Sequence, residues 1–196
     1  MTEEEMLVRK ALNFAALAHS KVVNKDGTVG QRRKGTSIPY IVHPVEVCMI
    51  LRENGCSAEV QAAGLLHDTV EDTGVTLDEI EKQFGSKVRD LVAGESEDKM
   101  RTLSEKASWK ARKQHTIDGL KSATKEEMYV CAADKLSNLR SMAYDLAVSG
   151  ESLWRRFNAS KEDIKWYYSS VAENLEPIKD KPMRAELLSL IAEVFD

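Results

Sequence analysis

The sequence lacks the features that mark secreted, membrane-spanning and nucleic-acid-binding proteins. Its three cysteines form no CxxC pair, and an odd number of cysteines suits a reducing compartment better than a disulfide framework. No apolar run approaches the roughly 20 residues that a membrane-spanning helix needs, and the N-terminus, MTEEEML, is acidic where a secretory signal would be basic. The formal net charge of -4 argues against broad binding to nucleic acids or anionic membranes. We therefore expect a cytoplasmic protein without a nucleic-acid or membrane partner.

The sequence also lacks internal repeats, low-complexity tracts and any linker rich in proline, glycine and serine. A chain of 196 residues can bury a substantial core as one unit, so we expect one domain over residues 1–196. β-Branched residues rarely alternate with polar ones over more than four positions, whereas apolar residues recur at helical spacing near both termini. The two sets are Leu7, Ala11, Phe14, Ala15 and Ala18, and Leu187, Leu188, Ile191, Val194 and Phe195. This pattern predicts an all-α fold of roughly eight to ten helices.

One short stretch, LLHDTVEDT at residues 65–73, places polar side chains directly after an apolar run. The apolar run predicts a buried helix. The polar residues that follow are His67, Asp68, Glu71 and Asp72. If the helix continues through them, four residues advance it by about 400°, which puts Glu71 one turn above His67. Asp72 then stands above Asp68 in the same way.

Carboxylates near a buried helix are costly, so this cluster needs a stabilising partner. For isolated residues, a hydrogen-bonded core histidine and a solvated helix end would be the ordinary interpretations. Several carboxylates held together repel one another, however, and each loses hydration near an apolar wall. A bound cation would remove both costs. The stretch therefore suggests a divalent metal ion.

Two residues elsewhere in the sequence could complete a metal site. His43 precedes Pro44 and is expected at the start of a helix, and Asp134 follows the apolar helical run from Met128 to Ala133. Two imidazoles and two carboxylates form a mixed nitrogen and oxygen set that suits Mn²⁺, Fe²⁺, Zn²⁺ or Mg²⁺. Because no thiolate lies at a useful spacing, we expect an open, catalytic site rather than a structural zinc site.

The motifs around these residues resemble a known family. The order of His43, His67-Asp68 and Asp134 resembles the metal-dependent phosphohydrolases of the HD superfamily. Three segments, RRKGTSIPYIVHP, LLHDTVEDT and ADKLSNLR, together resemble the hydrolase domain of the RelA/SpoT family and its small single-domain relatives, the small alarmone hydrolases, over residues 7–172. The resemblance implies a single compact HD-type helical domain, one Mn²⁺ ion, and removal of the 3′-pyrophosphate from guanosine tetra- or pentaphosphate, a small nucleotide substrate.

The resemblance also implies roles for individual residues. Its metal-binding positions fall on His43, His67, Asp68 and Asp134, and its catalytic pair falls on Glu71 and Asp72. We expect one carboxylate of that pair to orient or deprotonate the attacking water, and we assign this main acid/base role to Glu71. Asp72 could instead only position the water or a histidine ligand.

Substrate contacts are expected from cations near the proposed metal and from one amide. Planar guanidinium groups stack on purines and bind phosphate. The resemblance places Arg33 and Lys34 at the guanine-contacting pair and Asn138 at a nucleoside contact. From a basic run at residues 99–113 we select Lys99 as a further contact, with a solvated basic patch as the alternative for these cations. Four residues, rather than the family's usual three, separate the Arg-Lys pair from the following Pro-Tyr, which bears on guanine specificity more than on hydrolysis.

Two other functions fit the same residues. The hydrolytic centre could act on another nucleotide, such as a 5′-monophosphate or a 3′-phosphorylated adenosine cofactor, and a non-catalytic module could sense a nucleotide or a metal. All proposed ligands and both catalytic carboxylates are present, which favours an enzyme. His19 and His115 match no ligand position and are expected to be bystanders. The aromatic residues at 154–168 could form core or the interface of a homo-oligomer.

Overall fold

The computed structural model describes residues 1–24, 26–95 and 105–196. Within those ranges it contains ten α-helices, two 3-10 helices and, besides two isolated β-bridges, no strand. The α-helices are α1 (Glu3–Ser20), α2 (Val42–Glu53), α3 (Ala58–Leu66), α4 (Thr69–Asp72), α5 (Leu77–Phe84), α6 (Ser86–Glu95), α7 (Glu105–Leu120), α8 (Lys125–Ser149), α9 (Lys161–Asn174) and α10 (Pro182–Phe195), and the 3-10 helices are η1 (Gly150–Arg156) and η2 (Glu176–Ile178). None of these described helices has the length and apolar character needed to cross a membrane. The prediction of an all-α fold with roughly eight to ten helices is confirmed.

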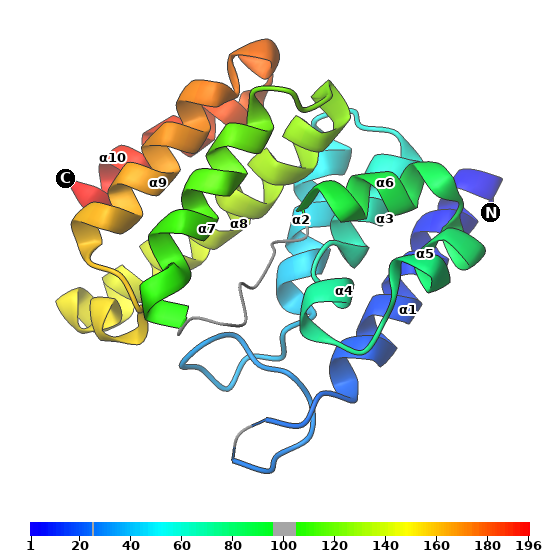
Figure 1. Cartoon of the computed structure of the whole chain (residues 1–196), viewed down its shortest axis with the longest axis horizontal. Helices are drawn as coiled ribbons and strands as arrows, with labels where there is room; N and C mark the ends of the chain where they lie inside the picture. The colour runs from blue at the N-terminus through cyan, green and yellow to red at the C-terminus, as the bar shows by residue number, and fades with distance from the viewer. Residues whose placement is uncertain (25, 96–104) are drawn as a thin grey trace.

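Helices α3 and α8 organise the packing. Helix α3 packs against α1, α2, α6 and α8. On one side of the molecule α7, α8, α9 and α10 lie side by side, and on the other lie α1 and α3 to α6 (Figure 1). The long helix α8 contacts α2, α3 and α6 as well as α9 and α10, so it joins the two groups. The start of α2, the end of α3 and the middle of α8 therefore come together.

Helix α3 is apolar around its last turns because neighbouring helices enclose it. Its most deeply buried side chains, each at most 2% exposed, are Val60, Ala62, Ala63, Leu65 and Leu66. Gly64 lets α2 approach closely, since a Cβ at this position would lie 2.5 Å from Leu51 Cδ1 and 3.1 Å from Val47 Cγ1. Such contacts are shorter than packed side chains tolerate. The glycine therefore sets the separation between α2 and α3.

Side-chain caps define where α5 and α8 begin. Thr76 Oγ1 accepts from the Glu79 backbone N–H, and the Glu79 carboxylate accepts from the Thr76 N–H. Thr124 and Glu127 make the same reciprocal pair at the start of α8. These boxes satisfy backbone donors that have no partner in the first helical turn. The start of α8 is thereby defined, and with it the set of α8 residues that faces α2 and α3.

The aromatic side chains near residues 154–168 belong to the core or pack against it. Tyr167 and Tyr168 are buried, and the Tyr168 ring centroid lies 6.2 Å from that of Phe195 on α10. The Trp154 ring centroid lies 5.5 Å from the same phenylalanine. Aromatic pairs at such separations add to the burial energy of the rings. Of the two interpretations of this segment, core packing is the one confirmed for these side chains.

Gly64→Ala should lower the free energy of unfolding by about 1–3 kcal/mol, because the added Cβ would overlap Leu51 and force α2 away from α3. Urea denaturation followed by circular dichroism measures the change. Gly119→Ala in α7 is the matched control, since a Cβ there meets nothing within 4 Å, and alanine favours a helix by up to about 1 kcal/mol. An unfolding midpoint for Gly64→Ala equal to that of the wild type would contradict this account of the packing.

Candidate active site

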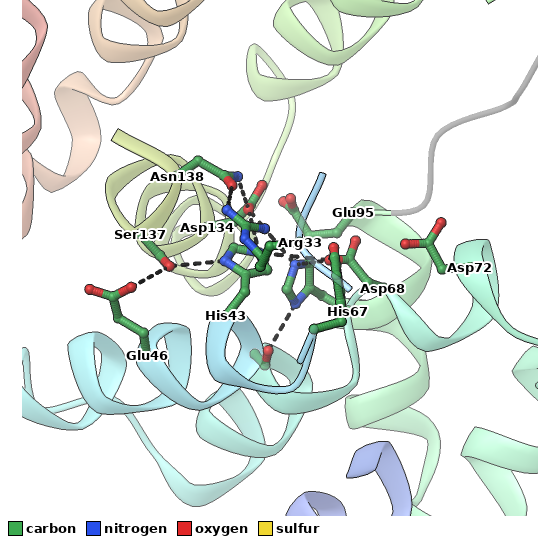
Figure 2. A network of polar contacts seen from close by, with 12 residues as sticks. Arg33, His43, Glu46, His67, Asp68, Asp72, Glu95, Asp134, Ser137 and Asn138 are labelled. Atoms are coloured by element: carbon green, nitrogen blue, oxygen red, sulfur yellow. Dashed lines mark hydrogen bonds and ion pairs between the residues drawn. The ribbon is translucent and has the colours of Figure 1, made fainter. Parts of the chain in front are cut away.

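Two buried imidazoles face each other where α2 begins and α3 ends. His43 and His67 are each 3% exposed, and their ring centroids lie 5.2 Å apart (Figure 2). His67 Nδ1 lies 2.9 Å from the carbonyl oxygen of Gly64. A carbonyl can only accept, so Nδ1 carries the hydrogen and Nε2 is the atom that faces the site.

The tautomer of His43 follows from a chain of two hydrogen bonds. His43 Nδ1 lies 2.9 Å from Ser137 Oγ on α8, and that hydroxyl donates to Glu46 Oε2 at 2.8 Å. Since the serine has only one hydrogen to give, its oxygen accepts from His43 Nδ1–H. His43 Nε2 is therefore the second imidazole nitrogen that faces the site. Figure 2 shows this chain running from α2 through α8 and back to α2.

Two carboxylates meet these two nitrogens. Asp134 Oδ1 lies 3.1 Å from His43 Nε2, and Asp68 Oδ2 lies 2.9 Å from His67 Nε2. The crossed distances, His43 to Asp68 and His67 to Asp134, are 3.7 and 3.8 Å. Ligand atoms of His43, His67 and Asp134 all lie within 4.8 Å of one another. Four groups from α2, the α3–α4 turn and α8 thus converge on one point.

This convergence requires a positive charge between the groups. Imidazole lone pairs and carboxylate oxygens repel one another unless a proton or a metal ion lies between them. Neutral imidazole and carboxylate are also the nitrogen and oxygen donors that divalent transition ions accept. The residues present therefore fit a divalent metal ion. The compact group of possible ligands consists of His43, His67 and Asp134. The Asp68 carboxylate lies beside this group, and its coordination of the ion stays a prediction.

The pKa values of the four groups differ in direction. Burial lowers the pKa of His43 and outweighs the opposing effect of Asp134. Burial also acts to lower the pKa of His67, but the nearby Asp68 and Asp134 outweigh it and raise this pKa to about 10. Both carboxylates have a pKa below the usual range, because neighbouring cations outweigh the effect of burial. In the metal-free site a second ring proton is therefore favoured on His67 and disfavoured on His43.

Hydrogen bonds from outside the cluster orient both carboxylates. Asp68 accepts from the Tyr40 hydroxyl. Asp134 accepts from Asn138 Nδ2 at 2.6 Å through Oδ1 and from the buried Lys135 ammonium through Oδ2. Fixed carboxylates of this kind are typical of preorganised metal sites. Neither Tyr40 nor Lys135 was predicted as a site residue, because neither stands out from the motif that contains it.

The prediction that one continuous helix runs through LLHDTVEDT is wrong. Helix α3 ends at Leu66, residues 67–68 form a turn, and Thr69–Asp72 form the separate helix α4. Two side chains bind the carbonyls that would continue α3, since His67 Nδ1 bonds Gly64 O and Thr69 Oγ1 bonds Leu66 O. The Asp72 N–H still donates to Asp68 O at 2.9 Å, so Asp72 stands one turn beyond Asp68 as expected.

The predicted catalytic pair lies at the same site. Glu71 and Asp72 line a cavity of about 210 Å³ together with the metal-ligand candidates. Gln31 Nε2 donates to Asp72 Oδ2 at 2.8 Å, and Gln31 Oε1 lies 2.6 Å from His19 Nδ1. His19 is not among the candidate metal ligands, but it is buried and holds the glutamine that orients Asp72. The description of His19 as a bystander is therefore incomplete.

The predicted base-contacting residues lie beside this cavity. Arg33 Nη2 donates to Asn138 Oδ1 at 2.7 Å, and the Arg33 guanidinium carbon lies 5.7 Å from the centre of the Tyr40 ring. Arg33, Lys34 and Asn138 line a second cavity of about 240 Å³, and Tyr40 and Asn138 line both cavities. The structure thus brings three of the four predicted substrate contacts together. Lys99 lies outside the described residues.

Besides Lys135, three charged residues that were not predicted as site residues line the site cavity: Glu95, Arg112 and Lys113. Both cations come from the basic run at residues 99–113, from which only Lys99 was predicted as a substrate contact. Glu95 ends α6, and its side chain is 8% exposed with Oε2 3.9 Å from Lys135 Nζ. Burial raises the pKa of Glu95 to about 7, even though Lys135 acts to lower it. No local pattern in the sequence indicates this burial.

Glu95 should make stability depend on pH. Its pKa of about 7 in the folded chain exceeds the usual value of 4.5, so the stabilisation from the protonated form is complete below pH 4.5 and is lost as pH rises through 7. Glu95→Gln should therefore raise the free energy of unfolding at pH 8 by of the order of 1–3 kcal/mol and have little effect at pH 4.5. Denaturation across this pH range measures it, with the exposed Glu173→Gln as control. An equal effect of Glu95→Gln at both pH values would contradict the raised pKa.

Comparisons with known proteins show the family to which the chain belongs. Residues 11–165 match the family model described as HD domain. The chain is 37% identical over 145 residues to the guanosine-3′,5′-bis(diphosphate) 3′-pyrophosphohydrolase MESH1 of Xenopus tropicalis. This alignment covers 72% of this chain and 73% of the relative. A chloroplastic relative from Oryza sativa subsp. japonica is 39% identical over 150 residues, 72% of this chain, but the chain spans only 16% of that longer protein.

A solved structure resembles the fold over nearly its whole length. It is that of a metazoan ortholog of SpoT that hydrolyzes ppGpp, with a TM-score of 0.72, 27% identity, and coverage of 95% of this chain and 94% of that one. The match to the family model includes all four candidate metal ligands. The chain therefore belongs to the HD-domain family and is a relative of its SpoT-type hydrolases.

Proposed function

We propose that this protein removes the 3′-pyrophosphate from guanosine tetraphosphate and pentaphosphate, releasing GDP or GTP and pyrophosphate. The observation that carries the proposal is the adjacency of two cavities. One holds the imidazole and carboxylate cluster with Glu71 and Asp72, and the other is lined by Arg33 and Lys34. A hydrolytic centre beside a cation-lined cavity suits a nucleotide whose phosphates and base are bound apart. The names of the relatives support the same reaction.

The metal ion is proposed to be Mn²⁺, held by His43, His67, Asp68 and Asp134. When bound, a divalent ion supplies Lewis-acid polarisation of a phosphoryl oxygen and lowers the pKa of water. The protein contributes the rigid placement of the donors. Gly64 O and Ser137 Oγ fix the two imidazoles with Nε2 inward, and Lys135 and Asn138 fix the Asp134 carboxylate.

Glu71 is proposed to act as the acid/base residue. Water attacks the phosphorus next to the 3′-oxygen, a new P–O bond forms, and the bond from phosphorus to the 3′-oxygen breaks. Glu71 takes the proton from the attacking water, and the departing 3′-oxygen takes up a proton to become a hydroxyl. Asp72 is held by Gln31, so its proposed role is to position the water or an adjacent group. Arg112 and Lys113 line the same cavity, where they can neutralise phosphate charge.

The purified protein should release GDP and pyrophosphate from guanosine 3′,5′-bis(diphosphate) in the presence of Mn²⁺. The same assay should include Mg²⁺ and Zn²⁺, a 5′-monophosphate such as GMP, and a 3′-phosphorylated adenosine cofactor, with products identified by chromatography. Chelation of the metal should abolish turnover, because the site then lacks the divalent charge. Faster turnover of another nucleotide would favour the alternative substrate class, and no turnover of any nucleotide with any metal would refute hydrolysis.

Glu71→Gln should lower kcat by about 10²- to 10⁴-fold, the usual contribution of a positioned acid/base group. The bound metal, measured by elemental analysis, should not change, because Glu71 is not among the proposed ligands. Asp72→Asn should have a smaller effect, since the amide can still bond Gln31. Glu53→Gln, an exposed carboxylate at the end of α2, is the control. A wild-type rate in Glu71→Gln would remove this residue from the mechanism.

A further inference from the structure

One face of α8 runs from the metal-ligand candidates into the second cavity. Asp134 and Asn138 lie at the first site, and Ser141, Met142 and Asp145 line the second cavity further along the helix. Asp145 is eleven residues beyond Asp134, which is about three full turns and roughly 16 Å along the axis. The two aspartates therefore share one helix face. One carboxylate belongs to the metal-ligand cluster, and the other to the far end of the adjoining cavity.

Asp145 is a carboxylate in the wall of a cavity that both polar and apolar side chains line. Its Oδ2 accepts from Arg156 Nη1 at 2.8 Å, and the two side chains are 19% and 25% exposed. Met142, Leu153 and Phe157 supply the apolar part of the same wall. Within the described part of the chain Asp145 has no second hydrogen-bond partner, so Oδ1 retains its capacity to accept. A partly buried carboxylate with an open oxygen suits a ligand that donates hydrogen bonds.

The loop before α2 holds this pair in place. Gly35 has a φ of +71°, and a Cβ on it would lie 2.9 Å from Arg156 Cδ and 3.2 Å from Cγ. The loop backbone therefore packs directly on the arginine side chain. This is the loop that separates Arg33-Lys34 from Pro39-Tyr40 by four residues. Its contact with Arg156 restricts the arginine that binds the Asp145 carboxylate in the cavity also lined by Arg33.

We propose that Asp145 is the residue that selects guanine over adenine in this protein. The proposal rests on the proposed function. The Watson–Crick edge of guanine presents two donors, N1–H and N2–H₂, beside the O6 acceptor, whereas adenine presents an acceptor at N1 and a donor at N6. A carboxylate with an arginine beside it offers an acceptor next to donors, which complements guanine. Adenine would place its N1 lone pair against the carboxylate. Sites built this way discriminate by leaving a partly buried polar group unpaired with the wrong ligand.

Asp145→Asn tests the proposal with the guanosine and adenosine forms of the 3′,5′-bis(diphosphate). Asparagine is nearly isosteric and can still accept from Arg156, so the fold should be retained. Its amide N–H₂ can donate to adenine N1 and meets guanine N1–H with a donor. The variant should therefore lose roughly 10- to 100-fold in kcat/KM for the guanosine form, mostly through KM, and should gain activity on the adenosine form. Opposite changes for two substrates are not expected from a merely structural role.

Asp90→Asn is the matched control. Asp90 Oδ1 also pairs with an arginine, Arg89 Nε, at 2.8 Å, but it lies on the exposed face of α6 and lines neither cavity. This variant should leave the ratio of the two kcat/KM values unchanged. Equal losses on both substrates in Asp145→Asn, or an unchanged ratio, would overturn the assignment of specificity to Asp145.

Binding measurements separate failure of this proposal from failure of the proposed reaction. The affinities of wild type and Asp145→Asn for the two nucleotides can be measured by calorimetry without added metal. If neither nucleotide is hydrolysed but the wild type binds the guanosine form more tightly and Asp145→Asn does not, the specificity assignment stands and the reaction is refuted. If hydrolysis occurs and the ratio of affinities is the same in both proteins, the reaction stands and the assignment to Asp145 is refuted.

Discussion

The meeting of two imidazole nitrogens with two carboxylates is the constraint on which the rest of the site depends. His43 and His67 each use Nδ1 to bond a group behind them, so each presents Nε2 to the carboxylates of Asp68 and Asp134. Four electron-rich groups can share so small a space only around a positive charge. A proton on His67 meets this need in part, and a divalent ion meets it more fully.

The packing of the surrounding helices keeps the four ligand candidates from moving apart. His43 begins α2, His67 follows α3, and Gly64 lets the two helices pack more closely than any other residue would allow. Asp134 comes from α8, which packs against both. The ligand candidates thus come from three parts of the chain, α2, the turn between α3 and α4, and α8, and these parts pack against one another. A rigid scaffold of this kind keeps mutually repelling groups within reach of one ion.

The sequence was sufficient to predict the candidate metal ligands, because they lie in recognisable motifs. His43, His67, Asp68 and Asp134 were predicted from residue type and order, and the structure brings them together. The break between α3 and α4 could not be predicted from helical periodicity, because it comes from side chains that bind backbone carbonyls. Glu95 and Gln31 could not be predicted either. Each is an ordinary polar residue whose importance comes only from a neighbour distant in the sequence, Lys135 for one and Asp72 for the other.

A single helix relates the proposed hydrolytic centre to the proposed base pocket. Because Asp134 and Asp145 lie on one face of α8, the distance between them is set by helix geometry rather than by a flexible loop. If the base is bound near Asp145, only a phosphate attached to one of the ribose oxygens can reach Asp134. A phosphate on the 5′-oxygen lies elsewhere relative to the base than one on the 3′-oxygen. The rigidity of α8 would therefore let the base pocket restrict both which base is bound and which phosphorus reaches Glu71.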